Sequence, residues 1–518
     1  MSHIDHRRIA GNSLMLYLRM GLIALVGLYT THVVLAALGK VDYGIYCAVG
    51  GVVMMASFIS NTMSTACQRF FSFELGREDY ERLRVVFTQC LIVFVLILLV
   101  VLALSETAGI WYLTHKMKLA GRDSAAYAVF QYSVAGFAFQ IMRTPYMGMI
   151  IAREKMKVFA YISVFEALAI LCVAMCLKHS GSDRLVLYAR LMFAVQMVTA
   201  FFYWLYCRTF YRECRLTMHV GGYGFGRLFR FTGWEMIGAL ASVCRTYGVN
   251  LLLNPFFGPV ANSARGLAQK VYMTVIQLND NVYPSVKPQV VKSYANNAVG
   301  EMLDLLLKST RLTYCLVLVV VMPLLMETPF LLGIWLNEVP EMTVLFTRLM
   351  LVNVMVDALS CQLPSAIQAT GRNKWYQIVI GLTLLTILPI AYVGMKFFHM
   401  DAAFVFYVSI FVSFAAMAVR LCFVRHQLGL DVRRYFSSVI LKVLSVTLVS
   451  AVLSVLTRMM AGNEGGAAAS VCVISLSILW TAASMYFIGM TTSERINSGK
   501  VLRNLVGVGN KNNKGQKR

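Results

Sequence analysis

Charged side chains are scarce in this sequence. Asp, Glu, Lys and Arg make up 14% of its 518 residues, hydrophobic residues make up 58%, and the mean hydropathy is +0.67. Proline is scarce as well, at 10 residues, so that long uninterrupted helices can form. Soluble globular domains carry about 25% charged residues. The composition therefore excludes an ordinary soluble protein and predicts an all-α polytopic membrane protein.

Sequence patterns of metal sites and of common enzymes are also missing. The 12 cysteines include no C-x-x-C pair, and none falls in a segment expected outside, so neither a zinc site nor a disulfide is predicted. There is no G-x-x-x-x-G-K-[ST] and no H-E-x-x-H motif, and the glycine-rich run at 221–226 follows no strand. We expect no catalytic residue, no metal and no cofactor, and leave coupling to H⁺ or Na⁺ open.

Apolar segments of membrane length follow one another along the chain. Because a span needs about 20 apolar residues, these segments predict about fourteen transmembrane helices, the first of which follows a short N-terminus without a cleavage site. The longest outer loop, near 107–124, has about 18 residues. No loop is large enough to hold a soluble catalytic domain.

The basic residues are distributed unevenly. A formal net charge of +23 by itself suggests nucleic acid. With the N-terminus inside, however, about 32 Lys and Arg lie in inner loops and tails and about 9 in outer loops. This asymmetry predicts that both termini are cytoplasmic and that the basic surface faces anionic lipid headgroups, not nucleic acid. The remaining cations lie within predicted spans: Arg19, Arg143, Arg190, Arg245, Arg265 and Lys270.

Four pairs of identical residues recur at one interval. Each pair is separated by 219 residues: Gly39 and Gly258, Pro145 and Pro364, Arg153 and Arg372, Lys155 and Lys374. Six spans per repeat is an even number, so the halves should share one orientation. The predicted organisation is two pseudo-symmetric six-helix lobes, residues 1–220 and 221–430, followed by two extra helices at 431–490 and a basic cytoplasmic tail at 491–518.

The predicted eighth span, near 259–291, carries an unusual number of polar residues on one face. At 100° per residue, four polar residues fall within roughly 60° of Asn262, and a fifth lies about 80° from it: Arg265, Gln269, Gln277 and Asp280, then Lys270. A cation at the bilayer centre costs a few kcal/mol, so this face must meet protein or water. Helix–helix pairing is the alternative interpretation, but several polar groups favour a water-filled cavity that attracts anions.

Other spans carry similar stripes of polar residues. They include Arg19 in the first span, Asn61 in the second, Thr246 and Asn250 with Arg245 beside them in the seventh, and Asn353, Asp357 and Ser360 in the tenth. We expect these spans to line a cleft between the halves, where transporters built from repeats bind substrate.

Carboxylates within spans are candidates for ion coupling. Asp280, Asp357 and Glu166 belong to this group. Alternative structural roles are open for all three, and Glu166 in particular is a candidate partner for Arg143 or Arg190. Arg190 is close enough to the outer interface to extend its side chain towards water.

Several segments resemble one known family. The stretches GKVDYGIY at 39–46, QRFFSFELG at 68–76, NSARGLA at 262–268 and PQVVKSY at 288–294 are similar to segments of bacterial polysaccharide flippases. These are the Wzx-type members of the multidrug/oligosaccharidyl-lipid/polysaccharide (MOP) exporter superfamily. The resemblance covers most of the chain, to about residue 430.

The resemblance implies a lipid-linked oligosaccharide as cargo. A polyprenyl-diphosphate-linked oligosaccharide would be moved from the cytoplasmic to the periplasmic leaflet of the inner membrane, by alternating access, with membrane lipids and polysaccharide polymerase machinery as further partners. In such flippases cavity cations are taken to hold the diphosphate, and Arg19, Arg245, Arg265 and Lys270 fit that description. We expect polar groups to solvate sugar hydroxyls: Asn61, Asn250, Asn262, Gln269 and Gln277.

Two other functions are alternatives to this one. A multidrug or cation antiporter of the same superfamily would require an acidic cavity, whereas the predicted cavity has more Arg and Lys than carboxylate. A membrane glycosyltransferase or polymerase would require catalytic residues in an outer loop, and the outer loops are too short. We therefore expect a transporter and not an enzyme.

Overall fold

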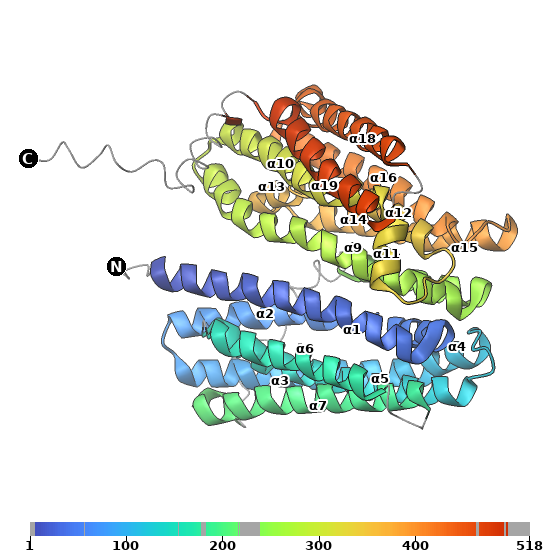
Figure 1. The fold of residues 1–518 in the computed structure, drawn as a ribbon. Coiled ribbons are helices and arrows are strands. Elements are labelled where there is room, and N and C mark those ends of the chain that lie inside the picture. Colours follow the sequence, from blue (N-terminus) through green and yellow to red (C-terminus); the bar gives the residue numbers. More distant parts are fainter. Residues whose placement is uncertain are drawn as a thin grey trace, which may run out of the picture. The chain divides into compact units, whose positions relative to one another are not determined.

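The computed structural model describes residues 6–55, 57–153, 155–177, 183–215, 217, 239–462, 466–491 and 494–495. This part of the chain contains helices and no strand. In chain order (Figure 1) the elements are α1 (His6–Met54), α2 (Ser57–Gly76), α3 (Tyr80–Leu104), η1 (Ser105–Gly109), α4 (Ile110–His115), α5 (Asp123–Ala152), α6 (Met156–Cys176), α7 (Arg184–Phe210), η3 (Arg212–Cys214), η4 (Cys244–Gly248), α9 (Val249–Ala295), α10 (Val299–Met326), α11 (Thr328–Trp335), α12 (Thr343–Ala358), α13 (Leu363–Thr370), α14 (Lys374–Leu385), α15 (Ile387–Phe397), α16 (Phe404–Leu428), α17 (Val432–Tyr435), η5 (Phe436–Ile440), α18 (Leu441–Ala461), α19 (Gly466–Ser484) and η6 (Met485–Gly489).

Nine helices of the described chain are long and apolar enough to cross a membrane, or ten if the bent pair α12 and α13 forms one span. Helices α2, α5 and α9 have 20, 30 and 47 residues but are not among the nine. These three helices carry polar residues, which lower their hydropathy. The structure confirms an all-α polytopic membrane protein, and the count of about fourteen spans stays a prediction.

The chain forms two compact units. The first contains Met1–Val271, Leu332–Leu349 and Lys374–Ala416, and the second contains Tyr272–Leu331, Met350–Asn373 and Met417–Arg518. The lobe boundaries expected at 220 and 430 stay a prediction. In the first unit, α5 packs against α7, α2 and α3 around large aromatic side chains that solvent does not reach. Lipid tails are as apolar as these side chains, so close van der Waals packing holds such a core together.

The second unit contains a packed group of α10, α18 and α19, which includes the two helices without a counterpart in the repeat. An ion pair between a buried arginine and a partly buried glutamate ties this group to the end of the described chain. Arg311 of α10 donates through Nη2 to both carboxylate oxygens of Glu494, at 2.6 Å each, and through Nη1 to the Ser438 carbonyl at 3.1 Å. Large apolar side chains of α18 point outwards, with Leu448 68% exposed, as expected of a surface that faces lipid.

Helices α1 and α9 each consist of two helices joined at a glycine. Gly39 has φ 77° and ψ 174°, and Gly258 has φ 78° and ψ −174°. A positive φ with extended ψ is accessible to glycine and strained for other residues. The same backbone conformation therefore occurs at two positions 219 residues apart, as the internal repeat predicts.

The boundary between two helices also recurs at the interval of the repeat, with one difference between the halves. Helix α5 ends at Ala152 before α6 begins at Met156, and α13 ends at Thr370 before α14 begins at Lys374. Pro145 lies inside the continuous α5, whereas Pro364 stands at the start of α13, which is bent by 42° from α12. The second repeat is thus broken where the first is continuous.

Candidate functional site

Asn250 joins three stretches of the first unit. It lies between η4 and the glycine kink at Gly258. Its Nδ2 donates to the Cys47 carbonyl of α1 at 3.4 Å, and its Oδ1 accepts from Nη1 of Arg265, beyond the kink, at 2.7 Å. The Asn250 carbonyl accepts from Nδ2 of Asn262 at 3.4 Å. One amide side chain therefore links α1 to both sides of the kink.

Close backbone approach makes these contacts possible. A Cβ on Gly44 of α1 would lie 1.9 Å from the carbonyl oxygen of Pro259, the residue that follows the kink. Real Cβ atoms do not approach an oxygen so closely, so a larger residue at this position would push the two segments apart. Glycine here brings the second half of α1 against α9.

Arg265 has a second acceptor in η4. Its Nη2 donates to the carbonyl of Thr246, which lies within this π turn. A π turn interrupts the regular hydrogen-bond ladder of an α-helix, and such turns are frequent at functional sites. The Arg265 side chain is buried, with the residue 3% exposed. The two acceptors described here, an amide oxygen and a backbone carbonyl, are uncharged.

Lys270 lies close to α1 on both sides of the Gly39 kink. Its Nζ is 3.3 Å from the position that a Cβ on Gly27 would take. The Cys47 thiol is within electrostatic reach of both Arg265 and Lys270. The structure thus brings together four of the predicted site residues in one unit, namely Arg265, Lys270, Asn250 and Asn262. We call these four residues the Arg265 cluster.

Two buried amide atoms in the part of α9 beyond the Gly258 kink make no hydrogen bond with any described residue. They are Oδ1 of Asn262 and Nε2 of Gln269. Buried polar atoms are nearly always paired, so these two mark positions for water or for a polar ligand. Gln277, on the same helix but in the second unit, is partly buried.

The other predicted cations have different surroundings. Arg245, also in η4, donates through Nη2 to Oγ of Ser413 in α16, at 2.8 Å. The side chains of Arg19, Asn61 and Asp280 lie outside the described residues, so that their predicted roles stay predictions.

Glu166 forms an ion pair within the first unit. Its Oε1 accepts from Nη1 of Arg143 at 3.0 Å and from Nε2 of Gln196 at 3.2 Å. This is the structural pairing that the sequence left open as an alternative to ion coupling. Asp357 is partly buried near the end of α12, just before the bend.

Arg420 is not among the cations that the sequence places within spans. It lies in α16 and donates through Nη1 to Oγ of Ser360, at 2.7 Å, in the break between α12 and α13. Tyr435 donates to the Leu359 carbonyl in the same break. Ser360 belongs to the polar stripe of the predicted tenth span. Its hydroxyl needs a hydrogen-bond partner inside the membrane, and this need was the signal that could have pointed to Arg420.

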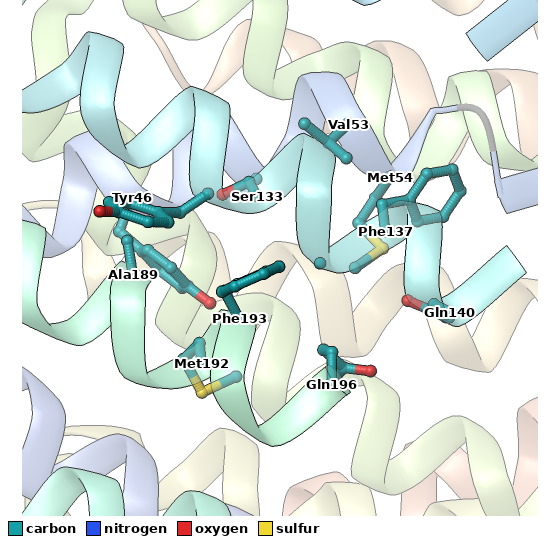
Figure 2. A pocket seen from close by; sticks show the side chains of 13 residues that line it. Tyr46, Val53, Met54, Ser133, Phe137, Gln140, Ala189, Met192, Phe193 and Gln196 are labelled. Carbon is teal, nitrogen blue, oxygen red and sulfur yellow. The ribbon is translucent and has the colours of Figure 1, made fainter. Parts of the chain in front are cut away.

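Figure 2 shows a small pocket of about 80 Å³ in the first unit, between residues of α1, α5 and α7. Tyr46 lies towards one end, and Gln140 and Gln196 lie towards the other. Ligand pockets usually measure about 300–1,000 Å³, so this one has room for a few waters and not for an oligosaccharide. Through Gln196 it adjoins the Arg143–Glu166 pair. No group of three or more His, Cys, Asp or Glu in the described chain is placed to hold a metal ion.

Comparisons with known proteins match at the level of structure only. No protein-family model and no curated protein sequence matches the chain. The lipid II flippase MurJ, in an inward closed conformation, superposes with a TM-score of 0.65 at 12% identity, covering 91% of this chain and 99% of its own. A multidrug resistance MATE family transporter of the MOP superfamily, inward-facing, gives 0.61 at 13% identity, with 80% and 94% covered. The chain has the MOP-transporter fold.

A third structure with this fold differs in its binding pocket. It is a MOP superfamily transporter from Pyrococcus furiosus with a pocket of reverse polarity, and it superposes with a TM-score of 0.57 at 12% identity, covering 82% of this chain and 95% of its own. Similarity at this level of identity shows the fold alone. The cargo must therefore be argued from the side chains of this chain.

Proposed function

We propose that this protein is a flippase that moves a polyprenyl-diphosphate-linked oligosaccharide from the cytoplasmic to the periplasmic leaflet by alternating access. The observation that carries the proposal is the Arg265 cluster, which gathers two cations and two amides in membrane helices. Cations inside a membrane are costly and usually mark a substrate or ion pathway. A diphosphate is a matching ligand, because guanidinium and ammonium groups donate strong hydrogen bonds to phosphate oxygens.

The contacts of Arg265 suggest how binding could be coupled to conformation. Its bonds to Asn250 and to the Thr246 carbonyl hold the two sides of the Gly258 kink together. Phosphate oxygens carry charge and bind arginine about twice as strongly as neutral oxygens. A diphosphate that replaces these acceptors would release the segment before the kink. The amide atoms of Asn262 and Gln269 that lack partners among the described residues would then take sugar hydroxyls.

The positive charge of the Arg265 cluster also favours this proposal over the alternative, a multidrug exporter. A multidrug exporter of organic cations would place carboxylates where this chain has Arg265 and Lys270, since like charges repel a cationic drug. We propose that the protein transports and does not catalyse a reaction, and that it passes its cargo to polysaccharide polymerase machinery on the outer side.

Export in this direction is favoured by the membrane potential. A headgroup of charge about −2 that leaves an interior-negative cell gains roughly 2.3 kcal/mol per charge per 100 mV. Return of the empty carrier could use H⁺ or Na⁺ through Asp280 or Asp357. We propose an inner-membrane location with both termini cytoplasmic, so reporters fused after Leu119 and after Gly462 should read periplasmic. A cytoplasmic signal at Leu119 would contradict this topology.

Complementation tests the proposed cargo. The gene is expressed in bacteria that lack a known flippase, and the returning surface glycan is measured. Arg265→Ala should abolish export at unchanged protein abundance, and Arg265→Lys should restore part of it, because lysine lacks the bidentate fork of arginine. The matched control is Arg190→Ala. Arg190 is an exposed arginine of α7 that donates to the Tyr132 hydroxyl at 3.2 Å, and its loss should leave export nearly unchanged.

Two outcomes would refute the proposed binding of the diphosphate by Arg265. Full export by an abundant Arg265→Ala protein would show that the guanidinium does not hold the cargo. Loss of the protein itself, with export per molecule unchanged, would show that Arg265 only joins helices.

A further inference from the structure

A second cavity, of about 650 Å³, lies in the first unit where α3 begins and where α5 and α7 end. Four arginines from three separate stretches of chain line it: Arg84 in α3, Arg153 just beyond α5, and Arg212 and Arg215 in the segment that follows α7. None of them belongs to the Arg265 cluster. The volume lies in the range of ligand sites.

Part of this basic lining is fixed by internal contacts. Arg153 pairs with Glu213 and stacks on the Tyr211 ring, with its Cζ 4.5 Å from the ring centroid. Arg84 donates through Nε to the carbonyl of Arg215 at 3.0 Å. These contacts anchor the segment after α7 to the ends of α3 and α5, so that the cavity is held by three elements.

Two of the arginines remain available to a ligand. Arg212 and Arg215 are exposed, and neither side chain makes an ion pair or a hydrogen bond within the part of the chain that the structure describes. The acidic residues of the lining are Glu213, which pairs with Arg153, and Glu81. Four arginines against two glutamates leave an excess of positive charge, which suits an anionic ligand.

The same cavity has an apolar edge. Tyr80 and Phe210 line it and are 51% and 66% exposed. Phe210 is the last residue of α7, and Tyr206 and Phe202 lie one and two turns before it on the same side of the helix. The Tyr206 ring packs on the Phe210 ring, with centroids 4.7 Å apart, and Phe202 is 37% exposed. An apolar surface therefore leads along α7 to the basic cavity. A ligand that uses both surfaces must have an anionic head and an apolar tail.

We propose that this cavity binds the phosphodiester headgroup of an anionic membrane phospholipid whose acyl chains lie along α7. Arginine matches phosphate oxygens with two parallel donors, and basic pockets at the cytoplasmic side of membrane helices bind anionic headgroups. The predicted topology places this end of α3, α5 and α7 on the cytoplasmic side. The site does not depend on the transported cargo, and a protein that exports something else would still carry it.

Native mass spectrometry of the purified full-length protein in detergent tests the site. Phosphatidylglycerol and phosphatidylcholine with identical acyl chains are titrated separately, and the wild-type protein should bind the anionic lipid preferentially. The variant Arg212→Gln/Arg215→Gln should weaken phosphatidylglycerol binding by about tenfold, since two arginines of the phosphate site are removed. Both residues are exposed, so their replacement should leave the thermal unfolding midpoint unchanged.

A matched control removes the same charge from the same end of the first unit. Arg82→Gln/Arg208→Gln replaces two exposed arginines of α3 and α7 that do not line the cavity, and it should weaken binding by about twofold or less. Phe210→Ser should weaken phosphatidylglycerol binding as well, because it removes the apolar edge.

Three results would overturn the proposal. Equal losses in the cavity and control variants would indicate general surface electrostatics. Equal binding of phosphatidylcholine would exclude recognition of the anionic head. Full competition by inorganic phosphate, together with unchanged binding in Phe210→Ser, would identify a site for free phosphate and not for a lipid.

Discussion

The acceptors described here for two buried arginines differ in charge. Arg265 in the first unit and Arg311 in the second are each 3% exposed, and each lies in a membrane-length helix. Arg311 donates to the carboxylate of Glu494, whereas Arg265 donates to the amide oxygen of Asn250 and to the Thr246 carbonyl. The two side chains are therefore equally removed from solvent, and the acceptors described for them differ in charge.

The difference bears on which arginine can exchange its ligand. Removing one member of a buried ion pair leaves an uncompensated charge, so such pairs act as structural ties. An anion that displaces a carboxylate from arginine replaces one charged acceptor by another and therefore gains little binding free energy. An anion that displaces neutral oxygens gains charge-assisted hydrogen bonds. On this reasoning Arg311 stabilises the second unit, and Arg265 is the better candidate to bind a phosphate.

The largest expected effect comes from replacing the amide acceptor of Arg265 by a carboxylate. Asn250→Asp places a carboxylate at the position of the Oδ1 acceptor, 2.7 Å from Nη1. Because this carboxylate competes with the diphosphate, glycan export should fall by at least about tenfold while the thermal midpoint holds or rises. The measurement is the complementation assay beside a melting curve. Unimpaired export would show that Arg265 need not release Asn250.

The opposite change tests Arg311 as a structural tie. Arg311→Ala leaves the Glu494 carboxylate without its partner and should lower the free energy of unfolding by about 3 kcal/mol. Export per folded molecule should stay unchanged. The double variant Arg311→Met/Glu494→Gln, which removes both charges, should recover most of the loss in a thermal melt. A stable Arg311→Ala protein that cannot export would place Arg311 in the transport path instead.

A smaller effect is expected at a third arginine with a carboxylate partner. Arg143 and Glu166 have side chains that are 14% and 19% exposed, and their atoms approach to 3.0 Å. Glu166→Gln should lower the free energy of unfolding by about 1.5 kcal/mol, through loss of a charged hydrogen bond, and should not abolish export. If export were instead lost at normal abundance, with its pH dependence altered, Glu166 would be an ion-coupling residue.

The smallest effect concerns pH. Burial alone would raise the pKa of the Glu494 carboxyl, but the hydrogen bond from the Thr491 N–H and the charge of Arg311 outweigh it and lower the pKa below its ordinary value. A carboxyl with a lowered folded-state pKa contributes stability above its unfolded-state pKa, and loses that contribution as the pH falls through the folded-state value. Acidification below about pH 4.3 should therefore lower the thermal midpoint by about 2 °C more in the wild type than in Glu494→Gln. Equal shifts in both proteins would mean that the pair does not titrate in this range.

Several features of the fold could be predicted because they depend on local sequence patterns. Apolar length and scarce charge indicate a polytopic helical membrane protein without reference to any contact. The repeat interval predicted equivalent positions for Gly39 and Gly258, and both glycines have the same conformation because only glycine adopts it without strain. Helical periodicity placed Asn262, Arg265 and Gln269 on one face, since three residues at such spacing share a side of any helix.

The partner of each buried polar group was decided by the tertiary structure. The sequence placed Arg143 and Arg265 alike within spans, but only packing brought the Glu166 carboxylate to Arg143 and the Asn250 amide to Arg265. Hydrogen-bonded pairs of this kind join residues far apart in the chain. Arg311 and Glu494 are separated by 183 positions, and Arg245 and Ser413 by 168. Hydropathy and periodicity describe one helix at a time, whereas desolvation makes each buried cation depend on whichever oxygen a neighbouring helix brings within hydrogen-bond distance.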